Sequence, residues 1–413
     1  MQNKFTRLKY ACYVTNISMA VVSNFSPLLF LTFRSLYGIS YSLLGLLILI
    51  NFCTQLAVDL IFSFFSHKFN ISCAVKLTPV LTSVGLLVFT VSPWILPNDL
   101  VYIGLALGTL IFSASGGLTE VLISPIIAKI PAKDPDREMS KLHSIYAWGA
   151  VAIVVIATLY IYLFGAENWQ WISLLFTLIP ITACILYAGV EIPDIESGGK
   201  TEGTLKMLKN GGVWLCVLGI FLGGSAECTM SQWSSGYVEG ALRIPKILGD
   251  IFGVALFSLA LGFGRTLYSK IGKNIEKVLF FGAIGATACY LIATFSSIAF
   301  VGLVACAATG FCVSMLWPGM LIVASEKFPS SGVFIYALMA SGGDLGASVG
   351  PQLVGLVTDA VIANNTAISL AEKLALTPEQ LGMKAGMLAG TLFPLTAIFI
   401  FLALWKGKRK EVK

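Results

Sequence analysis

The chain has 413 residues, of which 57% are hydrophobic and only 12% are charged. Soluble domains carry about 25% charged residues, so this composition excludes an ordinary soluble enzyme or binding domain. The net charge of +6 is spread over several short segments rather than gathered in one patch, which excludes nucleic acid as the main partner. The long apolar runs instead predict a helical protein embedded in a lipid bilayer.

Twelve segments are apolar and about as long as the roughly 20 residues that a helix needs to cross a bilayer. In chain order they cover residues 10–33, 41–66, 72–94, 98–128, 143–165, 169–190, 212–239, 247–269, 276–295, 297–326, 333–358 and 383–405. The predicted fold class is therefore all-α, a polytopic membrane protein with 12 transmembrane helices.

Lysine and arginine residues are distributed unevenly between the two ends of these spans. Of the 27 basic residues, 22 lie on the side that holds both termini and five lie on the opposite side. Those five are Arg34, Arg243, Lys246, Lys373 and Lys384. Because short cytoplasmic loops carry an excess of basic residues, we expect a multi-pass protein of the cytoplasmic membrane with both termini in the cytoplasm.

The cysteines and histidines do not form a metal-binding pattern. The chain has nine cysteines, mostly in mid-helix and with no CxxC pair, and only two histidines, His67 and His143. This set indicates neither a disulfide framework nor a metal site. We therefore expect no cofactor and no bound metal.

The longest hydrophilic interruption before the C-terminal region, residues 191–210, separates six predicted spans from six. It reads EIPDIESGGKTEGTLKMLKN, which is typical of a cytoplasmic linker. The halves 1–190 and 211–413 are weakly similar, since SLLGLLILINF opens the second span and KILGDIFGVAL opens the eighth. Two six-helix bundles in one chain are typical of secondary transporters.

The second span carries a polar stripe, because Asn51, Gln55 and Asp59 follow one another at four-residue spacing. Side chains of this kind often hold helices together inside a membrane. We expect a structural or gating role for Asp59. Contact with the solute or the coupling ion is the alternative for all three residues.

The fourth span holds Glu120 within SASGGLTEVLISP. A charged group at mid-membrane costs roughly 2.5–3.5 kcal/mol on insertion scales, so it needs a functional reason or a partner. Pro125 removes a backbone donor nearby, and we predict that Glu120 is the principal proton-coupling residue. The alternative is a buried ion pair with Lys129 or Arg265.

The seventh and eleventh spans contain two further acids, Glu227 and Asp344, which are the other proton-coupling candidates. Asp344 lies beside a stripe of three glycines at four-residue spacing, which favours close helix packing. An alternative role for Asp344 is to cap backbone amides near these glycines.

Several polar and aromatic side chains at membrane depth are candidates for binding the solute, since an indole can stack on an apolar face while its N–H donates a hydrogen bond. Core packing is the alternative for each deep tryptophan. The substrate-binding candidates are Asn24, Asn51, Gln55, His143, Tyr146, Trp148, Glu227, Gln232, Trp233 and Trp317.

Short motifs in both halves resemble the fucose permease and related glucose permeases of the major facilitator superfamily. They are Glu120 with Pro125 five residues later, HSIYAWGA (143–150), SAECTMSQWSSGYV (225–238), the Gly-Arg ending at Arg265, SMLWPGM (314–320) and GPQLVGLVTD (350–359), which ends in Asp359. The resemblance implies two bundles related by a pseudo-twofold axis, with the solute cavity lined by the first, fourth, seventh and tenth helices. Asp59, Arg265 and Asp359 would then serve gating or structural roles.

The sequence departs from this branch in ways that affect the coupling residues. The fucose permease group has an acid in the first helix, whereas residues 10–33 contain no Asp or Glu and offer only Asn16 and Asn24 as strong polar groups. Ser124 also replaces the asparagine that precedes Pro125 in that group, and the loop between the second and third spans is degenerate.

These features predict a secondary active transporter that works by alternating access as a monomer, with no obligate protein partner. We expect symport of a sugar or similar small polar solute with protons, and sodium is the less favoured coupling ion. Proton-coupled efflux of amphipathic or drug-like compounds is the alternative. A membrane enzyme is not favoured, because the embedded acids lie on four separate helices rather than at one interface.

Overall fold

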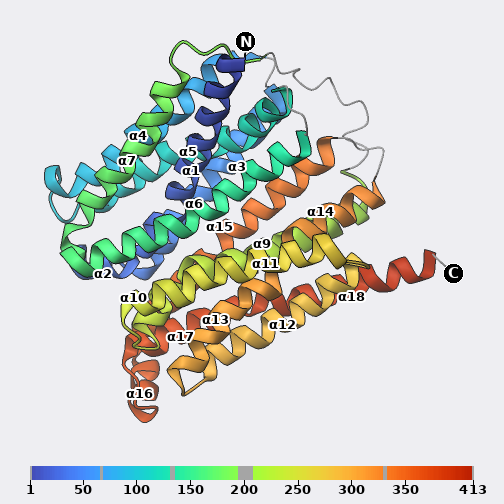
Figure 1. Cartoon of the computed structure of the whole chain (residues 1–413). Helices are drawn as coiled ribbons and strands as arrows, with labels where there is room; N and C mark the ends of the chain where they lie inside the picture. Colours follow the sequence, from blue (N-terminus) through green and yellow to red (C-terminus); the bar gives the residue numbers. More distant parts are fainter. Residues whose placement is uncertain (1, 66–67, 131–134, 194–207, 329–332, 412–413) are drawn as a thin grey trace. The chain divides into compact units, whose positions relative to one another are not determined.

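A computed structural model describes residues 2–65, 68–130, 135–193, 208–328 and 333–411 (Figure 1). All regular secondary structure within these ranges is helical, which confirms the predicted all-α fold. Backbone contacts divide the chain into two compact units, residues 1–38 with 50–200 and residues 39–49 with 201–413.

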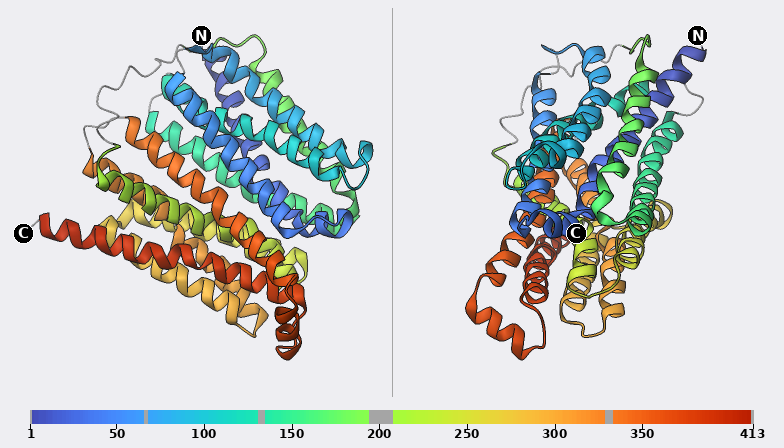
Figure 2. Two further views of the ribbon diagram at one scale, coloured as in Figure 1. Left: turned by 180° about the vertical axis from the view of Figure 1, so that it is seen from behind. Right: turned by 90° about the vertical axis from the view of Figure 1, so that its left-hand side faces the viewer.

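The first unit contains eight helical elements. They are α1 (Gln2–Leu28), α2 (Phe30–Tyr37), most of α3 (Tyr41–Phe65), α4 (Ile71–Ile95), α5 (Val101–Lys129), α6 (Pro135–Phe164), the short 3-10 helix η2 (Ala166–Asn168) and α7 (Trp169–Tyr187). Here α4 packs along α5, and α1 packs against both α6 and α7 (Figure 2).

The second unit contains the remaining elements. They are α9 (Gly211–Gly240), α10 (Lys246–Gly249), the π-helical turn η3 (Asp250–Ala255), α11 (Leu256–Ile271), α12 (Ile275–Phe295), α13 (Ala299–Val313), α14 (Leu316–Lys327), α15 (Val333–Ile362), α16 (Asn365–Lys373), α17 (Pro378–Gly390) and α18 (Leu392–Glu411). Residues 39–49, with the first turns of α3, are grouped with this unit.

The helices correspond to the predicted spans. Within the described residues, 10 segments are long and apolar enough to cross a membrane. Counted as one span bent by 51°, α1 and α2 bring the number to 11, and α6 holds a shorter apolar stretch, Trp148–Phe164. Each of the twelve predicted spans overlaps one of these segments.

Two spans are interrupted where a proline removes a backbone donor. Pro27 lies one residue before the end of α1, after which the chain bends into α2. Pro318, in the first turn of α14, cannot donate to the carbonyl of Ser314, and α13 ends at Val313. The carbonyl of Ser314 is thereby left open to another donor.

Each unit is held together by buried side chains and close helix contacts. In the first unit, the rings of Phe33, Phe89 and Trp169 form a buried cluster with centroids 5.1–5.7 Å apart. In the second unit, α15 lies against α9, and a methyl group added at Gly346 would overlap the backbone of Phe221. The glycine stripe on α15 therefore packs closely on α9, as the sequence predicts.

Candidate functional site

The polar stripe of α3 forms a hydrogen-bonded seam with α5. Asn51 Oδ1 accepts hydrogen bonds from Ser113 Oγ at 2.6 Å and from Gln55 Nε2 at 2.9 Å. Asn51 and Gln55 are both buried. The Ser113 hydrogen bond joins α5 to α3 through Asn51, as the helix-joining role expects, whereas the Gln55 hydrogen bond stays within α3.

Asp59, one turn further along α3, lies against the backbone of α5. A methyl group at Gly117 would lie 2.9 Å from the carbonyl oxygen of Gln55 and 3.1 Å from Oδ1 of Asp59. Only glycine therefore lets the two helices approach this closely. Asp59 is 8% exposed, and its Oδ1 accepts no hydrogen bond from the described residues.

Glu120, one turn beyond Gly116 on α5, is the acidic neighbour of Asp59. Asp59 packs against Gly117, which lies three residues before Glu120 on α5, so the two acids lie on neighbouring turns of the contact between α3 and α5. The Glu120 side chain is exposed, and none of the described residues forms a hydrogen bond or ion pair with it. Lys129, one proposed partner, has no ion pair within the described ranges.

Three of the remaining candidates in the first unit, Asn24, Tyr146 and Trp148, carry no positive charge. Asn24 Nδ2 donates to the carbonyl of Ala20 in its own helix at 2.9 Å. Tyr146 is half-buried on α6, and Trp148 on the same helix is 69% exposed. The side chain of His143 lies outside the described residues.

In the second unit, Glu227 of α9 forms an ion pair with Arg265 of α11. Arg265 Nη2 lies 3.0 Å and 3.2 Å from the two carboxylate oxygens of Glu227. Arg265 Nε also donates to the carbonyl of Ser314 at 3.0 Å, which is the carbonyl that Pro318 leaves without its helical donor. Arg265, considered from the sequence as a partner for Glu120, is instead the partner of Glu227.

Asp344 and Trp317 lie near this ion pair. Asp344 of α15 is 4% exposed, and it follows Gly343, against which the Trp317 ring lies. The Trp317 ring covers two glycines, since a methyl group would lie 3.0 Å from it at Gly224 and 2.5 Å from it at Gly343. Trp317 remains partly exposed, and its indole N–H donates to none of the described residues.

Trp233 has a different environment from Trp317. It is 1% exposed, and its Nε1 donates to the carbonyl of Pro351 at 2.9 Å. Its neighbour Gln232 is also buried. The indole N–H of Trp233 is already used within the protein, so the geometry favours the core-packing alternative for this residue.

Asp359 joins α15 to the first turn of α3 inside the second unit. Its carboxylate accepts hydrogen bonds from the backbone N–H of Tyr41 at 3.2 Å and of Ser42 at 2.6 Å, and also from the Ser42 hydroxyl. A carboxylate at this position satisfies amides that have no partner inside the helix. Asp359 therefore fastens the start of α3 to α15.

Replacing Asp359 with alanine removes this anchor and should lower the stability of the protein. By analogy with the loss of a helix cap, the expected loss is about 1–2 kcal/mol. Asp359→Asn should lose less, because an amide oxygen still accepts from a backbone N–H. Thermal unfolding of the full chain in detergent measures both, and equal melting temperatures for parent and Asp359→Ala would contradict the anchoring role.

Sequence comparison identifies the family. The Major Facilitator Superfamily profile matches residues 11–351. The chain belongs to the Major Facilitator Superfamily. No curated protein sequence matches it.

Solved structures of other superfamily transporters share its fold. A nucleoside transporter, NupG, aligns with a TM-score of 0.70 and 12% identity over 98% of this chain and 99% of that one. A bacterial homolog of the human lysosomal transporter Spinster, inward-facing and occupied, aligns with a TM-score of 0.69 and 13% identity, covering 97% and 96%. A D-xylose–proton symporter aligns with a TM-score of 0.67 and 14% identity, covering 94% and 96%.

Membership of the superfamily makes the chain a membrane transporter of small solutes rather than an enzyme. No group of three or more metal-binding side chains occurs in the part of the chain that the structure describes.

Two arrangements in this superfamily member were not predicted from the sequence. One is the proximity of Asp59 and Glu120. The glycines Gly116 and Gly117 before Glu120 allow the close helix contact, but they do not reveal which residue lies opposite. The other lies at the start of the eighth span, where Asp250 is fully buried on η3 and its Oδ2 lies 3.2 Å from Lys246 Nζ. Ser235 of α9 donates to the same carboxylate. The spacing of Lys246 and Asp250 by four residues on a helix could have revealed this pair.

Proposed function

We propose that the chain is a proton-coupled symporter of a small polar solute, a sugar or sugar-like compound, and that Asp59 and Glu120 together form its coupling site. A nucleoside transporter and a D-xylose–proton symporter are among the structures that share its fold. The observation that carries the proposal is the acid pair within the first unit. One member is buried with an oxygen that lacks a donor among the described residues, and the other is exposed.

The pair has the chemistry that coupling requires. Two neighbouring carboxylates repel each other when both are ionised, and burial further disfavours charge. This favours a state in which the pair holds one proton, and the exposed Glu120 can exchange that proton with water. When the proton affinity of a site differs between two conformations, proton binding and the conformational change are linked reciprocally.

The pair also provides a substitute for the first-helix acid that the fucose permease group has and this chain lacks. That resemblance implies an acid on the first helix as the partner of the fourth-helix glutamate, and the first helix here has none. In this chain the partner would instead be Asp59 on the second span. Sodium remains the alternative coupling ion, and replacement of the proton gradient by a sodium gradient distinguishes the two.

For the solute, we propose Trp317 as a stacking surface, with Glu227 and Arg265 as the polar groups beside it. A partly exposed indole above two glycines offers a flat apolar face and an N–H donor that none of the described residues uses. The Glu227 carboxylate can accept hydrogen bonds from solute hydroxyl groups, and the Arg265 guanidinium can donate hydrogen bonds to them.

Uptake into proteoliposomes tests the proposed function. The full chain would be reconstituted and given D-xylose, D-glucose, L-fucose and uridine, with an inward proton gradient and with the gradient collapsed by a protonophore. We expect accumulation of at least one of these solutes only when the gradient is present. Gradient-driven expulsion of an amphipathic dye, without uptake of any of the four, would contradict sugar symport and support efflux instead.

Trp317→Ala should weaken binding of the transported solute roughly tenfold, the size expected for loss of one aromatic contact. Trp233→Phe is the matched control, because it removes an indole whose N–H already serves the carbonyl of Pro351. Binding to detergent-solubilised protein, where no gradient exists, measures the effect. If Trp317→Ala binds as the parent does and Trp233→Phe does not, the two assignments are reversed.

We further propose that both termini lie in the cytoplasm and that the protein resides in the cytoplasmic membrane. Reporters fused after Lys209 and after the C-terminal Lys413 should indicate the cytoplasm, and a reporter inserted at Asn364 should indicate the outside. The expectation rests on the 22 basic residues that share the side of the termini. Any other combination would overturn this topology.

A further inference from the structure

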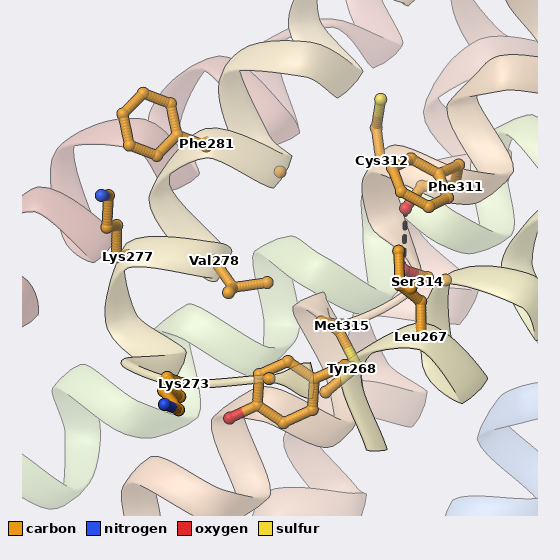
Figure 3. Close-up of a pocket in the computed structure, with 13 residues that line it drawn as sticks. Leu267, Tyr268, Lys273, Lys277, Val278, Phe281, Phe311, Cys312, Ser314 and Met315 are labelled. Carbon is orange, nitrogen blue, oxygen red and sulfur yellow. Dashed lines mark hydrogen bonds between the residues drawn. The ribbon is translucent and has the colours of Figure 1, made fainter. Parts of the chain in front are cut away.

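A pocket opens between α11, α12 and α13 in the second unit, apart from the groups assigned to coupling and to the solute (Figure 3). Its volume is about 490 Å³, which lies within the usual range for ligand sites of roughly 300–1,000 Å³. Much of its wall is apolar. The apolar side chains that line it are Leu267, Val278, Phe281, Phe311 and Met315.

The helices approach closely behind this pocket. A methyl group added at Gly282 of α12 would lie 2.7 Å from the carbonyl oxygen of Cys312. Gly282 therefore allows α12 to pack on α13, while the larger side chains around it leave space. The pocket is part of the helix packing rather than a gap between loops.

Two lysines stand at one end of the pocket, and none of the described residues neutralises their charge. Lys273 and Lys277 are exposed, and Figure 3 shows them on the opposite side of the pocket from Cys312 and Ser314. Neither forms an ion pair within the described residues. Lys277 Nζ lies over the ring of Phe281, 5.9 Å from its centroid. Glu276, next to Lys277 in sequence, is buried and does not line the pocket.

The pocket is polar at its outer end and apolar further into the membrane. Lys273 precedes α12, Lys277 lies in its first turn, and Phe281 is four residues, about 6 Å, deeper into the span. Phe281 is 53% exposed and Phe311 is 44% exposed. Both rings lie in segments that are long and apolar enough to cross a membrane, so within a bilayer they would face lipid chains. The pocket would then open both to the membrane interior and to its charged surface.

We propose that this pocket is a binding site for an anionic phospholipid. The phosphate would pair with Lys273 and Lys277, and one acyl chain would lie between Phe281 and Phe311. Basic pockets between transmembrane helices are suited to anionic headgroups, and the charge here complements such a headgroup. A soluble phosphate would satisfy the lysines but would not fill the apolar part of the pocket.

Tryptophan quenching by brominated lipid tests this site directly. Trp405 of α18 packs 6.2 Å from the ring of Phe281, which lines the pocket. The full chain in detergent would be titrated with phosphatidylglycerol or phosphatidylcholine, each with brominated acyl chains. Quenching that is present in the parent but lost in Trp405→Phe comes from Trp405. This part of the signal therefore reports lipid bound in the pocket. We expect saturable quenching by phosphatidylglycerol at concentrations where phosphatidylcholine gives little.

Variants separate the headgroup from the acyl chain. Lys273→Gln with Lys277→Gln should weaken phosphatidylglycerol binding roughly 30-fold, as expected for two charges near a membrane surface. The charge-matched control, Lys68→Gln with Lys209→Gln, should bind as the parent does. Val278→Phe keeps both lysines but fills the pocket, and it should also abolish the Trp405 signal.

Four results would overturn the proposal. The first three are equal quenching by the two lipids, unchanged affinity in the Lys273/Lys277 double variant, and persistence of the signal in Val278→Phe. Competition by millimolar inorganic phosphate that fully removes the signal would also overturn it, because it would indicate a soluble-anion site. The assay needs no transport, so its outcome is independent of the proposed symport.

Discussion

Glu120→Gln should still exchange solute across the membrane when the pH is equal on both sides, but it should fail to accumulate solute under a proton gradient. Glutamine mimics the protonated glutamate in shape and charge, so the conformational change remains open to the variant. The variant cannot release a proton, and the linkage between proton binding and the conformational cycle is lost. The expected result is that the internal concentration stops at the external one.

If the two acids act as a pair, Asp59→Asn should likewise exchange solute at equal pH but lose accumulation under a proton gradient. It removes the repulsion that favours a shared proton and leaves Glu120 as a single exposed carboxylate. Accumulation should fall strongly, and the pH dependence of solute binding should shift. Glu372→Gln, an exposed acid on α16, is the control and should accumulate solute normally. Full accumulation in Glu120→Gln would exclude Glu120 as the coupling residue and make Asp344 the next residue to test.

The second large effect is expected at the ion pair between α9 and α11. Arg265→Gln leaves Glu227 as a charge without its partner, and removing one partner of a buried pair costs about 3–5 kcal/mol. The Arg265 side chain is 42% exposed and that of Glu227 only 16%, so we expect a smaller loss, about 2–3 kcal/mol. The variant also removes the donor that satisfies the carbonyl of Ser314.

Glu227→Gln combined with Arg265→Gln should recover much of this stability, because no unpaired charge remains. Thermal unfolding of the parent, both single variants and the double variant gives the coupling energy between the two residues. If the loss of unfolding free energy in the double variant equals the sum of the losses in the two single variants, the coupling energy is zero. That result would contradict the ion pair.

The spans could be predicted from the sequence because apolar length is a direct requirement of the bilayer. The break in the tenth span follows from Pro318, and the close contact of α15 follows from its glycines. The cost of burying charge likewise singles out Glu120, Glu227 and Asp344 from the sequence alone. These properties are local in sequence.

The pairings could not be predicted, because they depend on which helix faces meet. Asp59 and Glu120 are 61 positions apart, and only the packing of α3 on Gly117 brings them together. The roles of Trp233 and Trp317 differ for the same reason. Both looked like deep indoles in the sequence, but a carbonyl of α15 takes the N–H of Trp233. The spacing of polar residues in the sequence also could not show that Arg265 forms its ion pair with Glu227.

The most direct test of the account is to measure proton movement that accompanies solute movement. Proteoliposomes with a trapped pH-sensitive dye, at equal pH on both sides and with the membrane potential clamped to zero, would receive an outside excess of the solute that the parent takes up. We expect solute entry to acidify the interior for the parent protein, and Glu120→Gln to admit solute without acidification. Solute entry through the parent with no change in internal pH, or equal acidification by parent and Glu120→Gln, would contradict coupling at the Asp59–Glu120 pair.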